Sequence, residues 1–356
     1  MKKSMLVIIV SMLLIIIPYP VSTTQIFENT IYVDDDASPD WYDETHVKTI
    51  QEGIDVASDG DTVFIYNGAY QPSTNIHVYK EVTIIGETKE GVIVEHETGS
   101  EALSIRAKNV EIRTITFRNF RITNLFNFDN AIITNNVFII DNDEKHWNPD
   151  VLYIVGEHNE ISNNIMTFTG TYDGNKNPSV GIFLQCYESS VINNVITGVD
   201  AGPIALSILD RSYWDNDFVK GKNIIEGNTF KNNRWGIHLT PTLRPGHNSR
   251  IVHNNFIDNQ KNAEFIVHLP SVRDIIKKNI NRLFNPSDSS DKNRYTPTGL
   301  LFKYWDENYW DDYDGNGPKT IPGTLQSAGL INQLFLYVFP WRSFDWHPAS
   351  VPYNIE

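Results

Sequence analysis

The segment Ile133-Thr134-Asn135-Asn136 returns in four related versions along the middle of this chain. These are Ile161-Ser162-Asn163-Asn164, Val191-Ile192-Asn193-Asn194, Ile225-Glu226-Gly227-Asn228 and Val252-His253-Asn254-Asn255. The last Asn recurs after 28, 30, 34 and 27 residues, and an Ile or Val always stands three residues before it. A period of this size, built from short β-rich segments without helical periodicity, predicts a stacked β-solenoid.

Asn residues suit the bends of such a solenoid. Asn tolerates the left-handed backbone conformation that a sharp bend between two strands requires. Stacked one above another, Asn side chains can also hydrogen-bond along the column. We therefore predict an all-β fold, a single-stranded right-handed parallel β-helix. Its aligned file of side chains is expected to contain Asn136, Asn164, Asn194, Asn228 and Asn255.

The composition narrows the class of partner. The chain has 356 residues and a formal net charge of -15 at pH 7. Binding to nucleic-acid phosphates needs a basic face, and the sequence contains no basic cluster that would supply one. We expect no nucleic-acid partner.

The first 24 residues have the pattern of a secretory signal peptide. Lys2 and Lys3 precede an apolar run from Met5 to Ile17, and small residues follow at Ser22. As a helix this run would span about 20 Å, which is short of the ~30 Å hydrocarbon core. The expectation is a secreted or cell-surface protein with no permanent membrane span after the signal is removed.

The ends of a β-helix expose core side chains and unpaired backbone groups, so both ends need caps. From Thr49 to Ala57 the apolar residues lie on one face of a short helix, and Trp305, Trp310, Trp341 and Trp346 crowd the last part of the chain. We divide the chain into a signal (1–24), an N-terminal strand and cap helix (25–62), the β-helix (63–284) and an aromatic C-terminal cap (285–356).

Cys186 is the only cysteine, so the sequence offers no intrachain disulfide. The alternation of Ile182 and Leu184 places Cys186 on the inward side of a strand. We expect a buried, unreactive thiol rather than a nucleophile or a metal ligand.

Segments at both ends of the chain resemble a known group of β-helix proteins. At the N-terminal end these are Thr49–Ile54, Gly60-Asp61-Thr62-Val63 and Val82–Gly86, and near the C-terminus Asn308-Tyr309-Trp310 and Phe344–Ala349. They resemble secreted parallel β-helix repeat proteins of the pectate-lyase-like superfold, such as the nitrous-oxide-reductase maturation family and archaeal surface proteins. The resemblance covers about residues 31 to 356. It implies fold and secretion and leaves activity open.

One strand of the repeat is flanked by the longest insertions. Alternation along that strand predicts Leu152, Ile182, Ile204, Ile237 and Phe265 inside the solenoid. The outward column is then Tyr153, Phe183, Ala205, His238 and Ile266, with neighbours about 4.8 Å apart. We interpret this column as the floor of a groove and the insertions as its walls.

The predicted groove carries side chains suited to sugars, because aromatic rings stack on sugar C–H faces while carboxylates and guanidinium groups pair with hydroxyls. The alternative is that the aromatic residues only pin the insertions onto the sheet. The candidate ligand-binding residues are Trp147, Asp150, Tyr153, Tyr172, Asp173, Phe183, Gln185, Asp210, Arg211, Trp214, Arg234, His238 and Arg244.

The sequence contains no complete catalytic motif. Hydrolysis of a glycosidic bond needs two carboxylates at a set separation, which a sequence does not give. The leading hypothesis is a monomer that binds polysaccharide or cell-surface glycan without catalysis. The alternatives are a polysaccharide lyase or glycoside hydrolase that acts in the groove, and a structural surface or adhesion protein.

The segment Asp312-Tyr313-Asp314-Gly315-Asn316-Gly317 has the spacing of a calcium-binding loop. Gly323 stands where an EF-hand loop has its bidentate Glu. Asp312, Asp314 and Asn316 are therefore candidate Ca²⁺ ligands, with a metal-free Asp/Asn/Gly turn as the alternative. No other cofactor is indicated.

Overall fold

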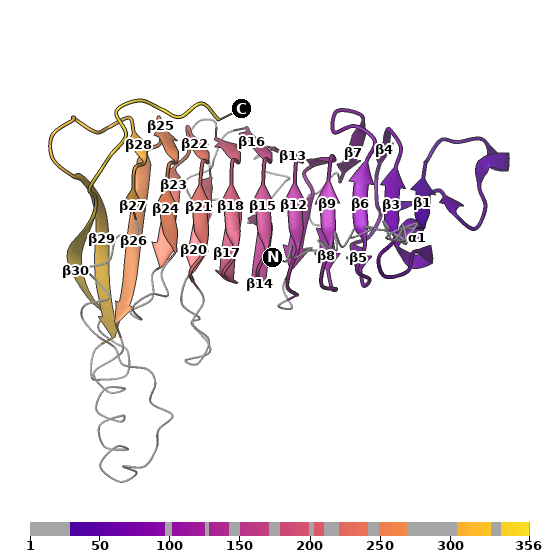
Figure 1. The fold of residues 1–356 in the computed structure, drawn as a ribbon, viewed down its shortest axis with the longest axis horizontal. Helices are drawn as coiled ribbons and strands as arrows, with labels where there is room; N and C mark the ends of the chain where they lie inside the picture. The colour runs from indigo at the N-terminus through magenta and orange to yellow at the C-terminus, as the bar shows by residue number, and fades with distance from the viewer. Residues whose placement is uncertain are drawn as a thin grey trace, which may run out of the picture.

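The protein is described by a computed structural model, which describes residues 29–96, 102–124, 128–141, 150–170, 179–198, 203–209, 221–240, 249–269, 305–328 and 336–355. In these ranges the chain winds into a rod of stacked coils (Figure 1). The coils form a right-handed parallel β-helix, which confirms the predicted fold class.

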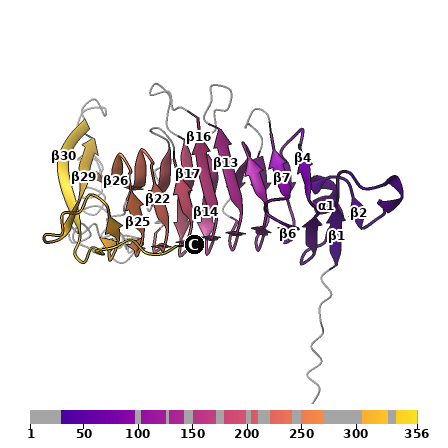
Figure 2. The ribbon, with the colours of Figure 1, turned by 90° about the horizontal axis from the view of Figure 1, so that it is seen from above.

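Three parallel sheets run along the rod, and Figure 2 shows them from a second side. The short-strand sheet contains β1 (Thr30–Val33), β3 (Thr62–Ile65), β6 (Thr83–Gly86), β9 (Glu111–Arg113), β12 (Ile132–Thr134), β15 (Glu160–Ser162), β18 (Ser190–Ile192), β21 (Ile224–Glu226), β24 (Arg250–Val252) and β27 (Trp305–Asp306). The middle sheet contains β4 (Gly68–Tyr70), β7 (Val92–Glu95), β10 (Thr116–Arg118), β13 (Val137–Asp141), β16 (Ile165–Thr169), β19 (Val195–Thr197), β22 (Thr229–Lys231), β25 (Asn255–Ile257) and β28 (Tyr309–Trp310).

The long-strand sheet positions the candidate site. It contains β5 (Ile76–Val78), β8 (Ala102–Ile105), β11 (Arg121–Asn124), β14 (Asp150–Glu157), β17 (Val180–Tyr187), β20 (Ile204–Leu209), β23 (Trp235–Thr240), β26 (Lys261–Leu269) and β29 (Lys319–Ala328). Its residue-by-residue pairing stacks equivalent side chains at about 4.8 Å per strand. Any surface pattern on this sheet is therefore repeated along the rod.

A file of buried Asn side chains runs along the rod at the bend between the short-strand and middle sheets. Asn164 donates from its backbone N–H and from Nδ2 to Oδ1 of Asn194, both at 3.0 Å. Asn194 bonds to Asn228 in the same way, and the described part of the file is Asn136, Asn164, Asn194, Asn228, Asn254 and Asn308, with Asp345 at its end. Because these side chains satisfy the backbone groups of each bend, the bends can be buried without unpaired polar atoms.

The predicted file was wrong at one coil. Asn254 occupies it, and Asn255 is instead the first residue of β25, where it bonds to the backbone of Tyr353. Both residues are Asn, so spacing alone did not separate them. Left-handed backbone occurs one residue before the file, at Asn135, Asn163, Asn193, Gly227 and His253.

The N-terminal end is covered by helix α1 (Ile50–Val56), close to the predicted segment. Thr49 and Glu52 form a capping box, in which Thr49 Oγ1 accepts from the Glu52 N–H and Glu52 Oε2 accepts from the Thr49 N–H. Ile50, Ile54 and Ala57 are buried against the first coils. The short elements η1 (Pro39–Trp41) and β2 (His46–Val47) precede this helix.

The C-terminal end is closed by an antiparallel pair, β29 and β30 (Leu336–Asp345). Trp305 and Trp310 are buried, and Trp310 stacks on Phe256 with ring centroids 4.2 Å apart. Trp341 and Trp346 are 37% and 54% exposed, so only two of the four tryptophans seal the end. The last described segment then runs back along the rod beside β25 (Figure 1).

Cys186 is fully buried, as predicted from alternation. Its Sγ lies 3.3 Å from the Ile154 carbonyl oxygen, inside the solenoid. No helix among the described residues is long and apolar enough to cross a membrane.

Candidate functional site

The outward side of the long-strand sheet, which we call the long-strand face, carries one continuous column of side chains. Strand pairing places one residue of each coil directly over the next. The column contains His77, Ser104, Thr123, Tyr153, Phe183, Ser207, His238 and Glu264. From Tyr153 to Glu264 it covers four strand spacings, about 19 Å.

Two residues of the predicted column were wrong. Ser207, and not Ala205, pairs with Phe183 and His238, and Ala205 is fully buried. Glu264, and not Ile266, pairs with His238. Ala205 and Leu206 are both buried at the start of β20, so a strict alternation of sides does not begin at Ile204.

Tyr153 and Phe183 form the aromatic centre of this face. Their rings stack with centroids 4.7 Å apart and planes 16° apart, and both side chains are half-buried. Burial, and then the nearby Asp150 carboxylate, raises the pKa of Tyr153. The pair presents a flat apolar surface that stays partly open to solvent.

Asp150 starts β14 beside this pair, and burial raises its pKa to about 6 although Arg121 opposes the shift. The carboxylate is therefore held in a place that disfavours its charge. A ligand hydroxyl or cation would relieve part of this cost.

Replacing Asp150 with Asn is expected to stabilise the protein at pH 7.5 by less than ~3 kcal/mol, the upper bound that a pKa of about 6 in place of 3.8 sets. The folded-state pKa lies above the ordinary 3.8, so wild-type stability rises as the pH falls from about 6 towards 4. Thermal unfolding at pH 7.5 and pH 4.5 should show the difference between Asp150→Asn and wild type shrinking at the lower pH. A difference that does not change with pH would contradict the assignment.

A second cluster surrounds Trp235 at the start of β23. Trp235 Nε1 donates to Glu264 Oε2 at 2.9 Å, and Lys261 Nζ lies 3.1 Å from the same oxygen. The Arg234 guanidinium lies over the indole at 4.5 Å from its centroid. Burial lowers the pKa of the neighbouring His238, so its imidazole is neutral at pH 7.

Sequence reasoning missed Trp235, Lys261 and Glu264. The shifted alignment of the last coils hid them, although an aromatic residue and opposite charges at the same offset in neighbouring strands would have been a usable signal. Of the predicted residues, the structure brings Asp150, Tyr153, Phe183 and His238 onto one face, with Arg234 at its edge. Gln185 is half-buried in the next outward position of β17.

Residues 35–276 match the family described as "Protein of unknown function (DUF1565)". This chain belongs to DUF1565. The match spans most of the β-helix, including the long-strand face from β5 to β26. No curated protein matches the chain.

Among solved structures, this DUF1565 protein is similar to a catalytic domain of a GH87 alpha-1,3-glucanase in complex with tetrasaccharides. Identity is 12%, the TM-score is 0.42, and the alignment covers 68% of this chain and 42% of that one. It is also similar to a pectin methylesterase mutant in complex with a hexasaccharide, at 15% identity and a TM-score of 0.38, over 67% of this chain and 78% of that one. The chain thus spans less than half of the glucanase domain. These similarities concern the fold alone.

Seven predicted ligand-binding residues of the DUF1565 chain lie outside the described residues, in the insertions next to the long strands. They are Trp147, Tyr172, Asp173, Asp210, Arg211, Trp214 and Arg244. Their participation stays a prediction.

The predicted calcium ligands lie in an exposed turn after β28. Asp312 Oδ2 lies 2.5 Å from Lys319 Nζ, and Asp312 Oδ1 accepts from Asn262 Nδ2 at 2.7 Å. Asp314 Oδ1 accepts from the Asn316 backbone N–H at 3.0 Å. Calcium would have to compete with these bonds, and its binding here stays a prediction. In the described part of the chain, the cluster of three carboxylates whose ligand atoms lie within 4.8 Å of one another is Asp34, Asp35 and Asp36, and not the predicted turn.

Proposed function

We propose that this DUF1565 protein is an exported monomer that binds a neutral polysaccharide along the long-strand face without cleaving it. The observation that carries the proposal is the stacked, half-exposed pair of Tyr153 and Phe183 in the outward column. Partly open aromatic rings beside polar groups are what a sugar ring needs, because one of its faces is apolar and its rim is polar.

The polar groups around the pair favour a ligand without net charge. Carboxylates and cations alternate along the face at Asp150, Arg121, Lys261 and Glu264, and His238 is neutral at pH 7. A polyanion would be repelled by the net charge of -15 of the whole chain. The repeat of about 4.8 Å per coil offers a polymer successive contacts along its length.

Export rests on the sequence of residues 1–24, which lie outside the described residues. The division into a cap region (25–62), a β-helix (63–284) and a C-terminal cap (285–356) belongs to the same proposal. Here the rod provides a rigid support for the binding face, and the caps keep that support monomeric.

The test is affinity electrophoresis of the folded protein through gels that contain one polysaccharide each. Suitable probes are glucan, mannan and galactan as neutral polymers and polygalacturonate as an acidic one. We expect retardation by a neutral polymer. Phe183→Ala should weaken retention at least ten-fold, since stacking contributes about 1 kcal/mol beyond the buried area that is also lost.

Tyr309→Ala is the matched control, because Tyr309 is a half-buried aromatic residue on the middle sheet. It should leave retention unchanged. The proposal fails if no polymer retards the protein, or if Phe183→Ala and Tyr309→Ala behave alike. A negative result of this kind, together with self-association of the rods, would favour the alternative of a structural surface or adhesion protein.

The raised pKa of Asp150 is the one observation that favours a second function, glycoside hydrolysis. A carboxyl that stays protonated near pH 6 is suited to general-acid catalysis. Such a mechanism also needs a second carboxylate across the bond. Release of reducing ends from a retained polymer, abolished in Asp150→Asn, would establish hydrolysis in place of binding alone.

A further inference from the structure

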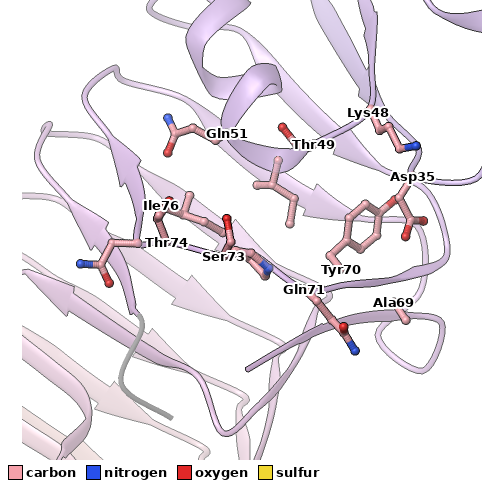
Figure 3. A pocket seen from close by; sticks show the side chains of 13 residues that line it. Asp35, Lys48, Thr49, Gln51, Ala69, Tyr70, Gln71, Ser73, Thr74 and Ile76 are labelled. Atoms are coloured by element: carbon pink, nitrogen blue, oxygen red, sulfur yellow. The ribbon is translucent and has the colours of Figure 1, made fainter. Parts of the chain in front are cut away.

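A cavity of about 450 Å³ lies at the N-terminal end of the rod. It opens between α1 and the segment that leads from β4 into β5 (Figure 3). The polar residues in its lining include Asp35, Lys48, Gln51, Tyr70, Ser73 and Thr74. This volume is at the lower end of the range for small-molecule sites.

The cavity adjoins the first strand of the long-strand face. Asn75 and Ile76 line it, and the next residue, His77, begins the outward column. Gln51 of α1 accepts from the His77 backbone N–H at 2.7 Å and donates to the His77 carbonyl at 3.2 Å. The helix that forms one wall of the cavity is thereby held in place against the binding face.

Several polar side chains of the cavity are not used by the fold. Lys48, Ser73 and Thr74 form no side-chain hydrogen bond and no ion pair within the described part of the chain. Gln51 and Asn75, in contrast, are engaged, since Asn75 Oδ1 accepts from the Ala102 N–H at 2.9 Å. Lys48, Ser73 and Thr74 can therefore bind a ligand without breaking a hydrogen bond of the fold.

Asp35 supplies an acceptor on the other side. Figure 3 shows Asp35 and Lys48 on the same side of Tyr70, opposite Gln51 and Thr74. Gly68 makes room for this carboxylate, because a Cβ on Gly68 would lie 2.5 Å from Asp35 Oδ1. Burial, and then the charges of Asp36 and Asp34, raises the pKa of Asp35. The carboxylate thus lacks part of the solvation that it would have in water.

We infer that this cavity binds the terminal sugar unit of the neutral glycan, as the closed end of the long-strand face. The inference rests on the function proposed above. A carboxylate that accepts from hydroxyls and an ammonium that donates to them suit a neutral polyol. A uronic acid would be repelled by the carboxylates of Asp34 to Asp36.

The test is calorimetric titration of the protein with glucose, galactose and mannose, and with glucuronate as the charged counterpart. We expect saturable binding of at least one neutral sugar and weaker binding of glucuronate. Asp35→Asn should weaken it about ten-fold, which corresponds to loss of a charge-assisted hydrogen bond. Asp36→Asn makes the same charge change at an exposed neighbour outside the cavity, and it should have no effect.

The outcomes separate this inference from the proposed function. Phe183→Ala should weaken polymer retention at least ten-fold while neutral monosaccharides still bind as well as they bind to wild type. The inference is overturned if none of the neutral sugars binds, if glucuronate binds equally well, or if both Asp variants behave alike. If monosaccharides bind but wild type is not retained by any polymer, the proposed function fails and the cavity is not the end of a polymer site.

Discussion

Replacing Asn194 with Leu is expected to destabilise the folded protein by about 4 kcal/mol or more, because the five hydrogen bonds of its buried side chain are lost at once. Asn194 Oδ1 accepts from the backbone N–H and from Nδ2 of Asn164, both at 3.0 Å. Asn194 Nδ2 donates to the Ile161 carbonyl at 2.8 Å, to the Ile192 carbonyl at 3.1 Å and to Asn228 Oδ1 at 3.0 Å. Each donor or acceptor left buried and unpaired costs about 1–3 kcal/mol.

The loss should also let the two parts of the rod on either side of Asn194 unfold less cooperatively, since each coil of a solenoid is stabilised by its neighbours alone. Hydrogen exchange should therefore show faster exchange in coils next to Asn194, and thermal unfolding should broaden or split. Urea titration followed by circular dichroism measures the change in the free energy of unfolding.

Three further variants test whether the effect is specific to the file of Asn side chains. Asn193→Ala changes the left-handed residue one position earlier and should cost only about 1 kcal/mol. Asn254→Leu should be as harmful as Asn194→Leu, whereas Asn255→Leu should mainly release the C-terminal segment at Tyr353. Equal losses for Asn193→Ala and Asn194→Leu would show that backbone conformation, and not the side-chain ladder, stabilises the bend.

Replacing Asp345 with Leu is expected to cost about 3 kcal/mol or more and to loosen the C-terminal cap. Its fully buried Oδ2 accepts three bonds, from the backbone N–H and Nδ2 of Asn308 and from Nε1 of Trp310. It therefore ends the Asn file and orients the indole that covers Phe256. Unfolding of the variant should begin at this end, and exposure of Trp310 should shift the tryptophan fluorescence to longer wavelength.

Asp345→Asn is the informative control, because an amide oxygen in the same place keeps the three acceptor contacts. Its cost should be much smaller than that of Asp345→Leu. If Asn and Leu at this position are equally destabilising, the negative charge itself is required. Asp345 would then act as an anion at the end of the Asn file rather than as one more hydrogen-bonding member of it.

The repeated pattern predicted the fold well for a physical reason. A solenoid is built from contacts between neighbouring coils, so the signal is local and returns in each coil. The cap helix was predicted equally well from the apolar face formed by Ile50, Ile54 and Ala57. Cys186 was correctly placed inside by alternation alone.

The errors fell where two registers were equally good in sequence. Asn254 and Asn255 are chemically identical, and the run from Ile204 to Leu206 is apolar throughout. A shift of one residue then reverses the side on which each side chain lies. The choice was made by pairing with the neighbouring coil, which placed Ser207 between Phe183 and His238 and brought Glu264 under Trp235.

By itself, the sequence determined that this chain forms a β-helix with bends built on Asn, because equivalent residues recur at a coil's length and each recurrence carries the same local preference. Only the tertiary structure decided which side chains share the long-strand face, and it revealed the cavity beside α1. Those features depend on the register between strands and on contacts between Gln51 and His77, which are 26 residues apart. Such contacts are set by packing in three dimensions, and no local pattern encodes them.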